Sequence, residues 1–338
     1  MNRVEKDIKE ILQHKELFIH LKEKTILITG ATGMIGSMLV KTLHEANLQY
    51  EMDINILAFI RNGKKAEKIF GGLDEYRDVS FIDQYNTQCD YIIHTISPTE
   101  SKYFINNPVE TIKSSVVSTM DVLEVAKKNN AVLVYLSSME QYGIPYKAHE
   151  VMTEDKIGII DHLNVRSSYS ESKRLCECMC VSYADEYNVD VKIARLAQTY
   201  GAGTPIDDNR MPMQFARAVL NHNDIVLHTE GKSISNSVYL SDAIYGLFVI
   251  LRYGVKGEAY NICNDSDTRS VKEIAELVSR NVANGTISVK IELSRDNLGY
   301  APDSTIYLNS QKLCNLGWRP QVQMQEGYSR LVDYLNSR

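Results

Sequence analysis

Tyr169 and Lys173, four positions apart in SYSESKR, are the pair of residues in this sequence whose types and spacing point most directly to chemistry. On a helix, residues at this spacing lie on one face. An ammonium group beside a phenol lowers the pKa of the phenol from about 10 toward neutrality. The tyrosine could then take a proton from a hydroxyl group as a hydride leaves for a nicotinamide. A Tyr–Lys pair on the protein surface is the alternative interpretation.

A run of glycines in ILITGATGMIG forms a second motif, with the spacing G-x-x-G-x-x-G. It follows an expected strand and precedes an expected helix. Glycines there permit a tight turn and a close backbone approach, and the helix N-terminus offers free N–H groups to a diphosphate. We therefore predict a dinucleotide-binding turn rather than a purely structural one. The predicted contacts are Gly30, Thr32, Gly33, Met34, Ile35 and Gly36.

The end of the second expected strand, AFIRN, bears on the choice between NAD and NADP. A carboxylate there would bind the ribose 2′-hydroxyl, but the chain has Arg61 and Asn62. A guanidinium suits a 2′-phosphate, so Arg61 favours NADP slightly, while a solvent-facing Arg61 with NAD bound stays open. The other predicted cofactor contacts are Asp83, Thr95, Tyr169 and Lys173.

Alternating strands and helices must position these motifs. We expect strands at 25–30, 54–62, 79–83, 89–97, 131–138 and 189–201, and helices at 34–47, 108–130 and 168–188. Continuous apolar strands separated by helices predict an α/β fold with a Rossmann-like, doubly wound parallel sheet that is buried on both faces.

The chain divides into three expected parts. Residues 1–23 form an N-terminal helical extension on the surface, with Ile8, Ile11, Leu12 and Phe18 on one side. Residues 24–200 form an NAD(P)-binding Rossmann domain. Residues 201–338 form a smaller C-terminal α+β substrate lobe that includes AYNICN, with some exchange of chain between the lobes.

The overall composition excludes several classes of partner. The 338 residues carry a net charge of −6, which gives no electrostatic case for nucleic acid or an anionic membrane. No apolar run approaches the roughly 20 residues of a membrane span, and the charged N-terminus lacks a signal peptide. We expect a cytoplasmic protein whose six cysteines are reduced. The cysteines and histidines show no metal-ligand spacing, so we expect no metal.

The combination of the glycine turn, a strand-end serine in LSSMEQYG and Y-x-x-x-K on the next helix resembles the extended short-chain dehydrogenase/reductase family. Within it, the chain is similar to the NAD-dependent epimerase/dehydratase branch, including UDP-glucuronate decarboxylases and nucleotide-sugar 4-epimerases. The similarity runs from residue 24 to about residue 335. It implies hydride transfer at a sugar carbon through a keto intermediate. Ser138 would bind the reacting oxygen, Tyr169 would be the base, and Lys173 would tune it and bind the ribose.

Met139 departs from this family's patterns. Related dehydratases have an aspartate there, followed by glutamate, and the decarboxylases commonly have serine. A thioether cannot donate a proton, so elimination of water is disfavoured, and epimerisation with Glu140 as a helper is the preferred interpretation. A net NADP(H)-dependent reductase or dehydrogenase of a nucleotide-linked sugar or alditol, a decarboxylase-like activity, and a regulatory protein without catalysis stay open.

The substrate contacts follow from the same resemblance. The family's diphosphate-binding arginine is replaced by Ser235, and Arg210 or Lys232 could supply the charge, unless both are surface cations. Arg295 is a candidate for holding a sugar carboxylate. The family also implies a homodimer through helices near 109–129 and 168–187, and a role in polysaccharide biosynthesis. The predicted substrate-binding residues are Ser97, Met139, Arg166, Gln198 and Arg210.

Overall fold

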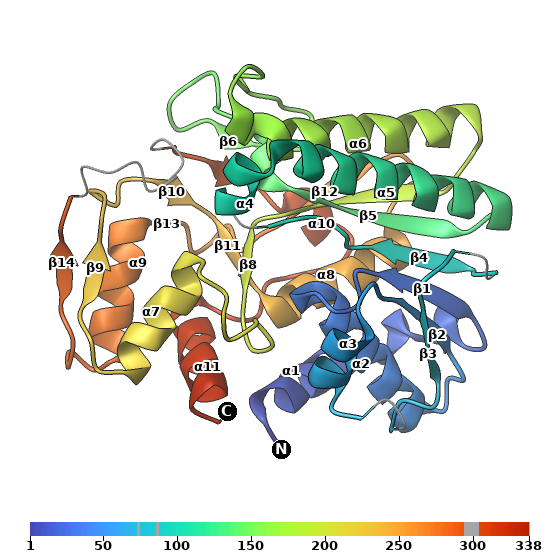
Figure 1. Ribbon diagram of the computed structural model, residues 1–338, viewed down its shortest axis with the longest axis horizontal. Helices are drawn as coiled ribbons and strands as arrows, with labels where there is room; N and C mark the ends of the chain where they lie inside the picture. Colours follow the sequence, from blue (N-terminus) through green and yellow to red (C-terminus); the bar gives the residue numbers. More distant parts are fainter. Residues whose placement is uncertain (73–74, 86–87, 100, 294–303, 338) are drawn as a thin grey trace.

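A seven-stranded parallel sheet forms the centre of the protein in the computed structural model, which describes residues 1–72, 75–85, 88–99, 101–293 and 304–337 (Figure 1). The strands lie in the order β12-β7-β5-β4-β1-β2-β3, and all six pairings are parallel. This confirms the predicted Rossmann-like α/β fold. The strands are β1 (Thr25–Thr29), β2 (Asn55–Phe59), β3 (Val79–Ile82), β4 (Tyr91–His94), β5 (Val132–Ser138), β7 (Val191–Leu196) and β12 (Ala259–Ile262).

Helices cover both faces of this sheet because each strand is apolar on both sides. Along β1, Ile26 and Ile28 face the core under α2 and α8, whereas Leu27 faces the core under α5 and α6. Figure 1 shows α5 and α6 together on one side and α2 and α8 on the other. The helices around the sheet are α2 (Met34–Tyr50), α3 (Gly63–Phe70), α4 (Ser101–Asn106), α5 (Pro108–Asn129), α6 (Ser168–Glu186) and α8 (Leu240–Tyr253).

Two expectations about the strands are wrong. The segment AYNICN does not belong to the smaller lobe, because its strand β12 pairs with β7 at the edge of the main sheet. The expected strand 189–201 is two strands, since the chain leaves the sheet after Leu196. Its second part, β8 (Gln198–Tyr200), pairs instead with β11 (Ser237–Tyr239).

The smaller lobe gathers most of the C-terminal chain. It contains two short paired ribbons, β9 with β14 and β10 with β13. Another short pair, β6 with β15, joins residues from the two halves of the chain. The remaining elements are β6 (Val151–Met152), β9 (Ile225–Leu227), β10 (Ile234–Ser235), β13 (Arg269–Ser270), β14 (Val289–Ile291), β15 (Tyr307–Leu308), α7 (Met211–Leu220), α9 (Val271–Leu277), α10 (Gln311–Cys314) and α11 (Met324–Asn336).

The N-terminal helix α1 (Arg3–Leu12) packs against this assembly rather than lying loosely on its surface. Ile8, Ile11 and Leu12 are buried, as the amphipathic pattern predicts, and Phe18 stacks near Phe248 of α8. Figure 1 places the N-terminus close to the C-terminal helix α11. In the described part of the chain, no helix has both the length and the hydrophobicity of a membrane span.

Candidate functional site

The three glycines of the turn between β1 and α2 are needed for different physical reasons. Gly30 has φ +66°, and a Cβ there would lie 2.6 Å from Oγ1 of Thr95. A Cβ on Gly36 would overlap the carbonyl oxygen of Gly30, so this residue lets α2 pack closely on the strand. A Cβ on Gly33 would meet only that same oxygen, at 3.2 Å. Packing within the chain therefore requires glycine at positions 30 and 36, and requires it less strictly at position 33.

Gly33 is the N-cap residue of α2, and no side chain caps this helix end. The first N–H groups of a 17-residue helix are thus left for another partner, and the helix dipole favours an anion there. Thr32, Met34 and Ile35 flank this position in the chain. The geometry of the turn fits the diphosphate of a dinucleotide, and its role in binding a cofactor stays a prediction.

Thr95 holds the turn from the neighbouring strand. Its hydroxyl donates to the carbonyl of Thr29 at 2.7 Å, and its N–H donates to Oγ1 of Thr29 at 3.1 Å. His94 Nδ1 lies 2.8 Å from the same Oγ1. Burial lowers the pKa of His94 to about 3, so its ring is neutral and serves this hydrogen-bond network.

The two serines at the end of β5 have different hydrogen-bond partners. Ser137 donates a hydrogen bond to Glu177, a buried carboxylate that pairs with Arg195 of β7 at 2.7 Å. Ser138 turns to the other side of the strand, accepts a hydrogen bond from Glu140 N–H at 3.2 Å, and is hydrogen-bonded to Tyr169. Ser138 is thus near enough to Tyr169 to lower its pKa, and their joint action in catalysis stays a prediction.

The expected lowering of the Tyr169 pKa beside Lys173 is not the net effect in this geometry. The Lys173 ammonium donates to the carbonyl of Leu136 at 2.7 Å and lies 5.8 Å from the centre of the Tyr169 ring. Burial raises the pKa of Tyr169 above its usual value, and the nearby Glu140 charge raises it further. Burial also lowers the pKa of Lys173 to about 8. Both groups are buried, so desolvation outweighs their mutual influence.

Phe104 of α4 is a site residue that the sequence reasoning missed. Its ring stacks face to face on Tyr169, with the ring centres 4.4 Å apart and an interplanar angle of 4°. Its carbonyl also accepts a hydrogen bond from Ser168 at 3.4 Å. The only signal in the sequence was an aromatic pair shortly before the Asn-Pro that begins α5.

Glu140 and Arg166, predicted for separate roles, bind one another. The Arg166 guanidinium reaches the two carboxylate oxygens of Glu140 at 3.0 and 3.4 Å. Ser170 also donates to Glu140 at 3.4 Å, one residue from Tyr169. Met139, between Ser138 and Glu140 in the chain, is partly buried against the core. Glu140, predicted as a catalytic helper, and Arg166, predicted to bind the substrate, thus form one ion pair beside Tyr169.

Arg210 lies against the first residue of α2, and its charge also acts on Tyr169. It pairs with Asp208 at 2.8 Å, donates to the carbonyl of Thr199 at 3.4 Å, and lies 3.7 Å from Sδ of Met34. Its positive charge lowers the pKa of Tyr169, opposing burial. Two further predicted substrate residues are polar and partly buried: Ser97, which is hydrogen-bonded to Ser115 at 3.3 Å, and Gln198 at the start of β8.

Arg61, Asn62 and Asp83 lie apart from this group, beyond β2 and β3. Asn62 caps α3 by accepting a hydrogen bond from Lys65 N–H at 3.0 Å, while Arg61 and Asp83 are exposed. These positions are at the carboxyl edge of the sheet, where the adenosine half of a dinucleotide binds in such folds.

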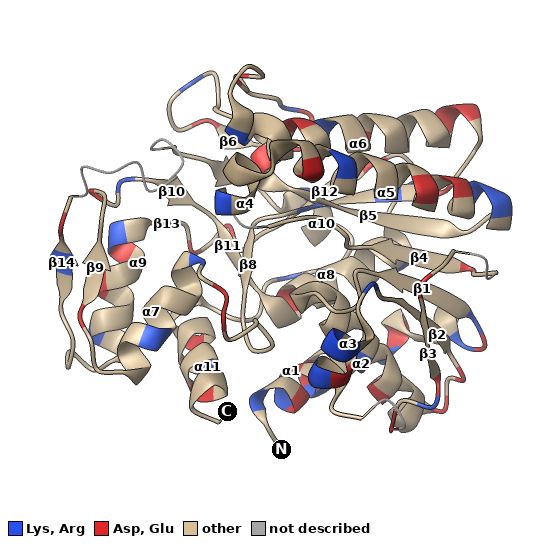
Figure 2. Cartoon of the chain, viewed as in Figure 1, with Lys and Arg blue, Asp and Glu red and all other residues tan. Residues whose placement is uncertain are grey.

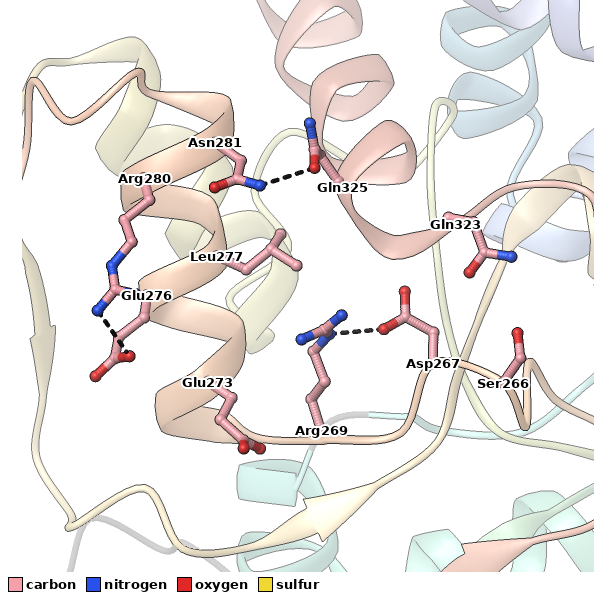
Figure 3. Close-up of a pocket in the computed structure, with 10 residues that line it drawn as sticks. All are labelled: Ser266, Asp267, Arg269, Glu273, Glu276, Leu277, Arg280, Asn281, Gln323 and Gln325. Atoms are coloured by element: carbon pink, nitrogen blue, oxygen red, sulfur yellow. Dashed lines mark hydrogen bonds and ion pairs between the residues drawn. The ribbon is translucent and has the colours of Figure 1, made fainter.

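The basic residues that could replace the family's diphosphate-binding arginine differ in their positions and in their ion pairs. Ser235 lies opposite Arg269 in the β10–β13 ribbon, but that guanidinium pairs with Asp267 at 2.6 Å. Arg269 lines a hollow of about 490 Å³ between α9 and the start of α11, among residues outside the predicted site (Figure 3). Lys232 pairs with Glu230, and Arg295 lies outside the described residues. Of these candidates, Arg210 is the one whose charge acts on Tyr169, as that of Arg166 also does.

The described residues hold no cluster of three or more His, Cys, Asp or Glu side chains that could bind a metal ion. The cysteines in this part of the chain are free thiols.

Comparison with known proteins finds relatives along nearly the whole chain. The NAD dependent epimerase/dehydratase family profile matches residues 26–263. UDP-glucuronic acid decarboxylase 1 of Xenopus tropicalis is 28% identical over 314 residues, covering 92% of this chain and 72% of that protein. UDP-glucuronic acid decarboxylase 5 of Arabidopsis thaliana is 30% identical over 305 residues, covering 89% of this chain and 86% of the relative.

A solved structure agrees with the fold. The UDP-glucuronic acid 4-epimerase of Bacillus cereus, in complex with UDP-glucuronic acid and NAD, superposes with a TM-score of 0.76. The two chains are 19% identical, and the superposition covers 93% of this chain and 99% of the epimerase.

The different packing of the glycines predicts different effects of a methyl group. Gly36→Ala should lower the free energy of unfolding by about 1–3 kcal/mol or more, because the new methyl overlaps backbone. Gly33→Ala should fold with near-normal stability but weaken NADH or NADPH binding about tenfold, since its methyl blocks the helix end. Urea denaturation and cofactor-fluorescence titration measure the two effects. Unchanged cofactor affinity in Gly33→Ala would contradict this assignment.

Proposed function

The chain belongs to the NAD dependent epimerase/dehydratase family, and we propose that it moves a hydride between a carbon of a nucleotide-linked sugar and a bound nicotinamide. The preferred reaction is epimerisation through a keto intermediate. The observation that carries this proposal is the placement of Ser138 at the carboxyl end of β5, on the same sheet edge as the uncapped end of α2, with the helix of the buried Tyr169 packed against β5.

Each residue has a role that follows from its surroundings. Gly30–Gly36 would hold the cofactor diphosphate, and Lys173 would bind its ribose. The bound nicotinamide would supply the acceptor and donor of the hydride. Tyr169 would take the proton of the sugar hydroxyl, and Ser138 would orient the same oxygen through a hydrogen bond.

The electrostatics of the site bear on how Tyr169 acts as a base. Burial and Glu140 favour the neutral phenol, whereas Arg210 and Arg166 favour the phenolate. A substrate that draws the Glu140 charge away from the phenol would therefore lower the pKa of Tyr169. We infer that the Glu140–Arg166 pair opens when substrate binds, so that Arg166 contacts the sugar or its diphosphate.

Decarboxylation is the second candidate, because two relatives at 28% and 30% identity are UDP-glucuronic acid decarboxylases. Oxidation at C4 of a hexuronic acid places a ketone β to the C6 carboxylate. The C5–C6 bond then breaks, CO₂ leaves, and the electron pair forms an enolate that takes a proton from water at C5. The reduced nicotinamide would then return the hydride to C4, while Tyr169 would give its proton back to the oxygen on C4. This step needs no proton donor at Met139.

One assay separates these reactions. The protein is incubated with UDP-glucuronic acid and, in separate reactions, NAD or NADP, and the products are examined by liquid chromatography with mass spectrometry. Unchanged mass at a new retention time means epimerisation, loss of CO₂ means decarboxylation, and stoichiometric change in cofactor redox state means a net dehydrogenase. Tyr169→Phe should lower the rate of whichever reaction occurs by about 10²–10⁴-fold while still binding NADH. Near-normal turnover by this variant would contradict the mechanism.

For the cofactor, we propose a slight preference for NADP, supported by Arg61 and by the lack of a carboxylate at the end of β2. Arg61→Ala should weaken NADPH binding about tenfold or more and leave NADH binding little changed, because one charge-assisted contact to the 2′-phosphate is lost. Lys68→Ala, at the far end of α3, is the matched control. Equal effects on both cofactors would show that Arg61 does not read the 2′-phosphate.

We also propose a homodimer through the outer faces of α5 and α6. Large apolar side chains are exposed there at Ile112, Val117, Met120, Leu175 and Val181. Sedimentation should give twice the chain mass of 38.3 kDa. Combining Met120→Glu with Leu175→Glu should give a monomer, whereas Val255→Glu, at an exposed apolar residue elsewhere, should stay dimeric. A monomeric wild-type protein would refute the proposal.

A further inference from the structure

Helix α1 holds a carboxylate that is fully buried. Asp7 has no exposed surface, and its oxygens lie 2.5 Å from Arg3, 3.0 Å from Arg330 and 2.8 Å from the hydroxyl of Tyr239. Burying a charge is costly unless it is paired and hydrogen-bonded, so this carboxylate is built into a specific arrangement. The helix precedes residues 26–263, which match the family, so the family pattern does not account for it.

The partners of Asp7 come from both halves of the molecule. Arg330 belongs to α11 of the smaller lobe, and it also contacts Glu10 of α1 at 2.6 Å. The apolar face of α1, with Ile8 and Ile11, packs against α2 and α8 beside the main sheet. Figure 2 shows the charged residues of α1 at the junction between these elements. The helix therefore spans the boundary between the two lobes.

Tyr239 carries the connection from Asp7 toward the site. Its hydroxyl donates to Asp7 and accepts a hydrogen bond from the backbone N–H of Ala202 at 3.3 Å. Because a phenol has one proton and can also accept, both bonds form together. Ala202 is fully buried at the start of the segment 201–210, which leads from β8 to α7.

The segment 201–210 lies directly on the cofactor turn. The hydroxyl of Thr204 is 3.1 Å from Sδ of Met34, the first residue of α2, and 2.7 Å from the carbonyl of Gly201. Arg210, at the end of the segment, is 3.7 Å from the same sulfur. A continuous set of contacts thus runs from Asp7 through Tyr239 and Ala202 to the turn.

We propose that α1 is a clamp that positions the segment 201–210, with Arg210, against the dinucleotide-binding turn, and that Asp7 and Tyr239 are positioning residues for cofactor binding. The inference rests on the proposed dinucleotide site. It assigns the N-terminal extension a part in function, in addition to the stability that its buried apolar face contributes.

Tyr239→Phe tests the clamp with little change in volume, because it removes only the hydroxyl between Asp7 and Ala202. We expect NADH and NADPH to bind about threefold to tenfold more weakly, the size of one hydrogen bond. Amide hydrogen exchange in the segment 201–210 should become faster at a temperature where the variant is fully folded. Ile11→Ala is the control: it should lower the melting temperature and leave the affinity and the exchange of the segment unchanged.

The outcomes are distinct. If Tyr239→Phe binds both cofactors as tightly as wild type with unchanged exchange, the clamp is refuted. It is also refuted if Ile11→Ala weakens binding as much as Tyr239→Phe does, since α1 would then act through stability alone. If wild-type protein binds neither NADH nor NADPH, the proposed function fails, and the exchange of the segment 201–210 still decides whether α1 positions it.

Discussion

The order of the strands in the main sheet is the constraint on which the site depends. After β1, β2 and β3 extend the sheet in one direction, and the chain then crosses back so that β4 lies on the other side of β1. Right-handed crossovers place the helices after β1 and β4 on opposite faces, and the carboxyl ends of the strands at such a reversal are where folds of this kind bind ligands. The glycine turn of β1, the Thr95 support after β4 and Ser138 at the end of β5 meet at that edge because the strands are parallel and adjacent.

The site also contains groups from outside the sheet, and their charges act on Tyr169. Arg210 arrives from the segment before α7, and Arg166 from the residues before α6. Their guanidinium groups oppose the effect of burial on Tyr169, while Glu140 reinforces it. Lys173, bonded to the carbonyl of Leu136, is held in the core of the site with its pKa lowered to about 8. The pKa of Tyr169 therefore depends on the opposition between desolvation and a small number of nearby charges.

Much of this arrangement could be predicted from the sequence, because the motifs are local. The glycine spacing, the strand before Ser138 and the four-residue interval between Tyr169 and Lys173 each depend on one turn, strand or helix. The helix α8 was not predicted, since all of its residues from Leu240 to Leu251 are buried and no exposed polar face marks it in the sequence. Strand β12 was misplaced because an isolated four-residue apolar stretch does not reveal its partner. The Glu140–Arg166 pair, the stacking of Phe104 on Tyr169 and the partners of Asp7 join distant segments, and only the folded chain brings them together.

The central claim is that hydride passes between the sugar and the bound cofactor beside Ser138 and Tyr169. The most direct measurement follows an isotope: UDP-glucuronic acid carrying deuterium at C4 is mixed with the enzyme, the reaction is quenched within one turnover, and the released cofactor is analysed by mass spectrometry. We predict deuterium in the reduced nicotinamide of the wild-type protein and none in Tyr169→Phe. Product that forms without any deuterium-labelled reduced cofactor at any time during the first turnover would contradict the mechanism.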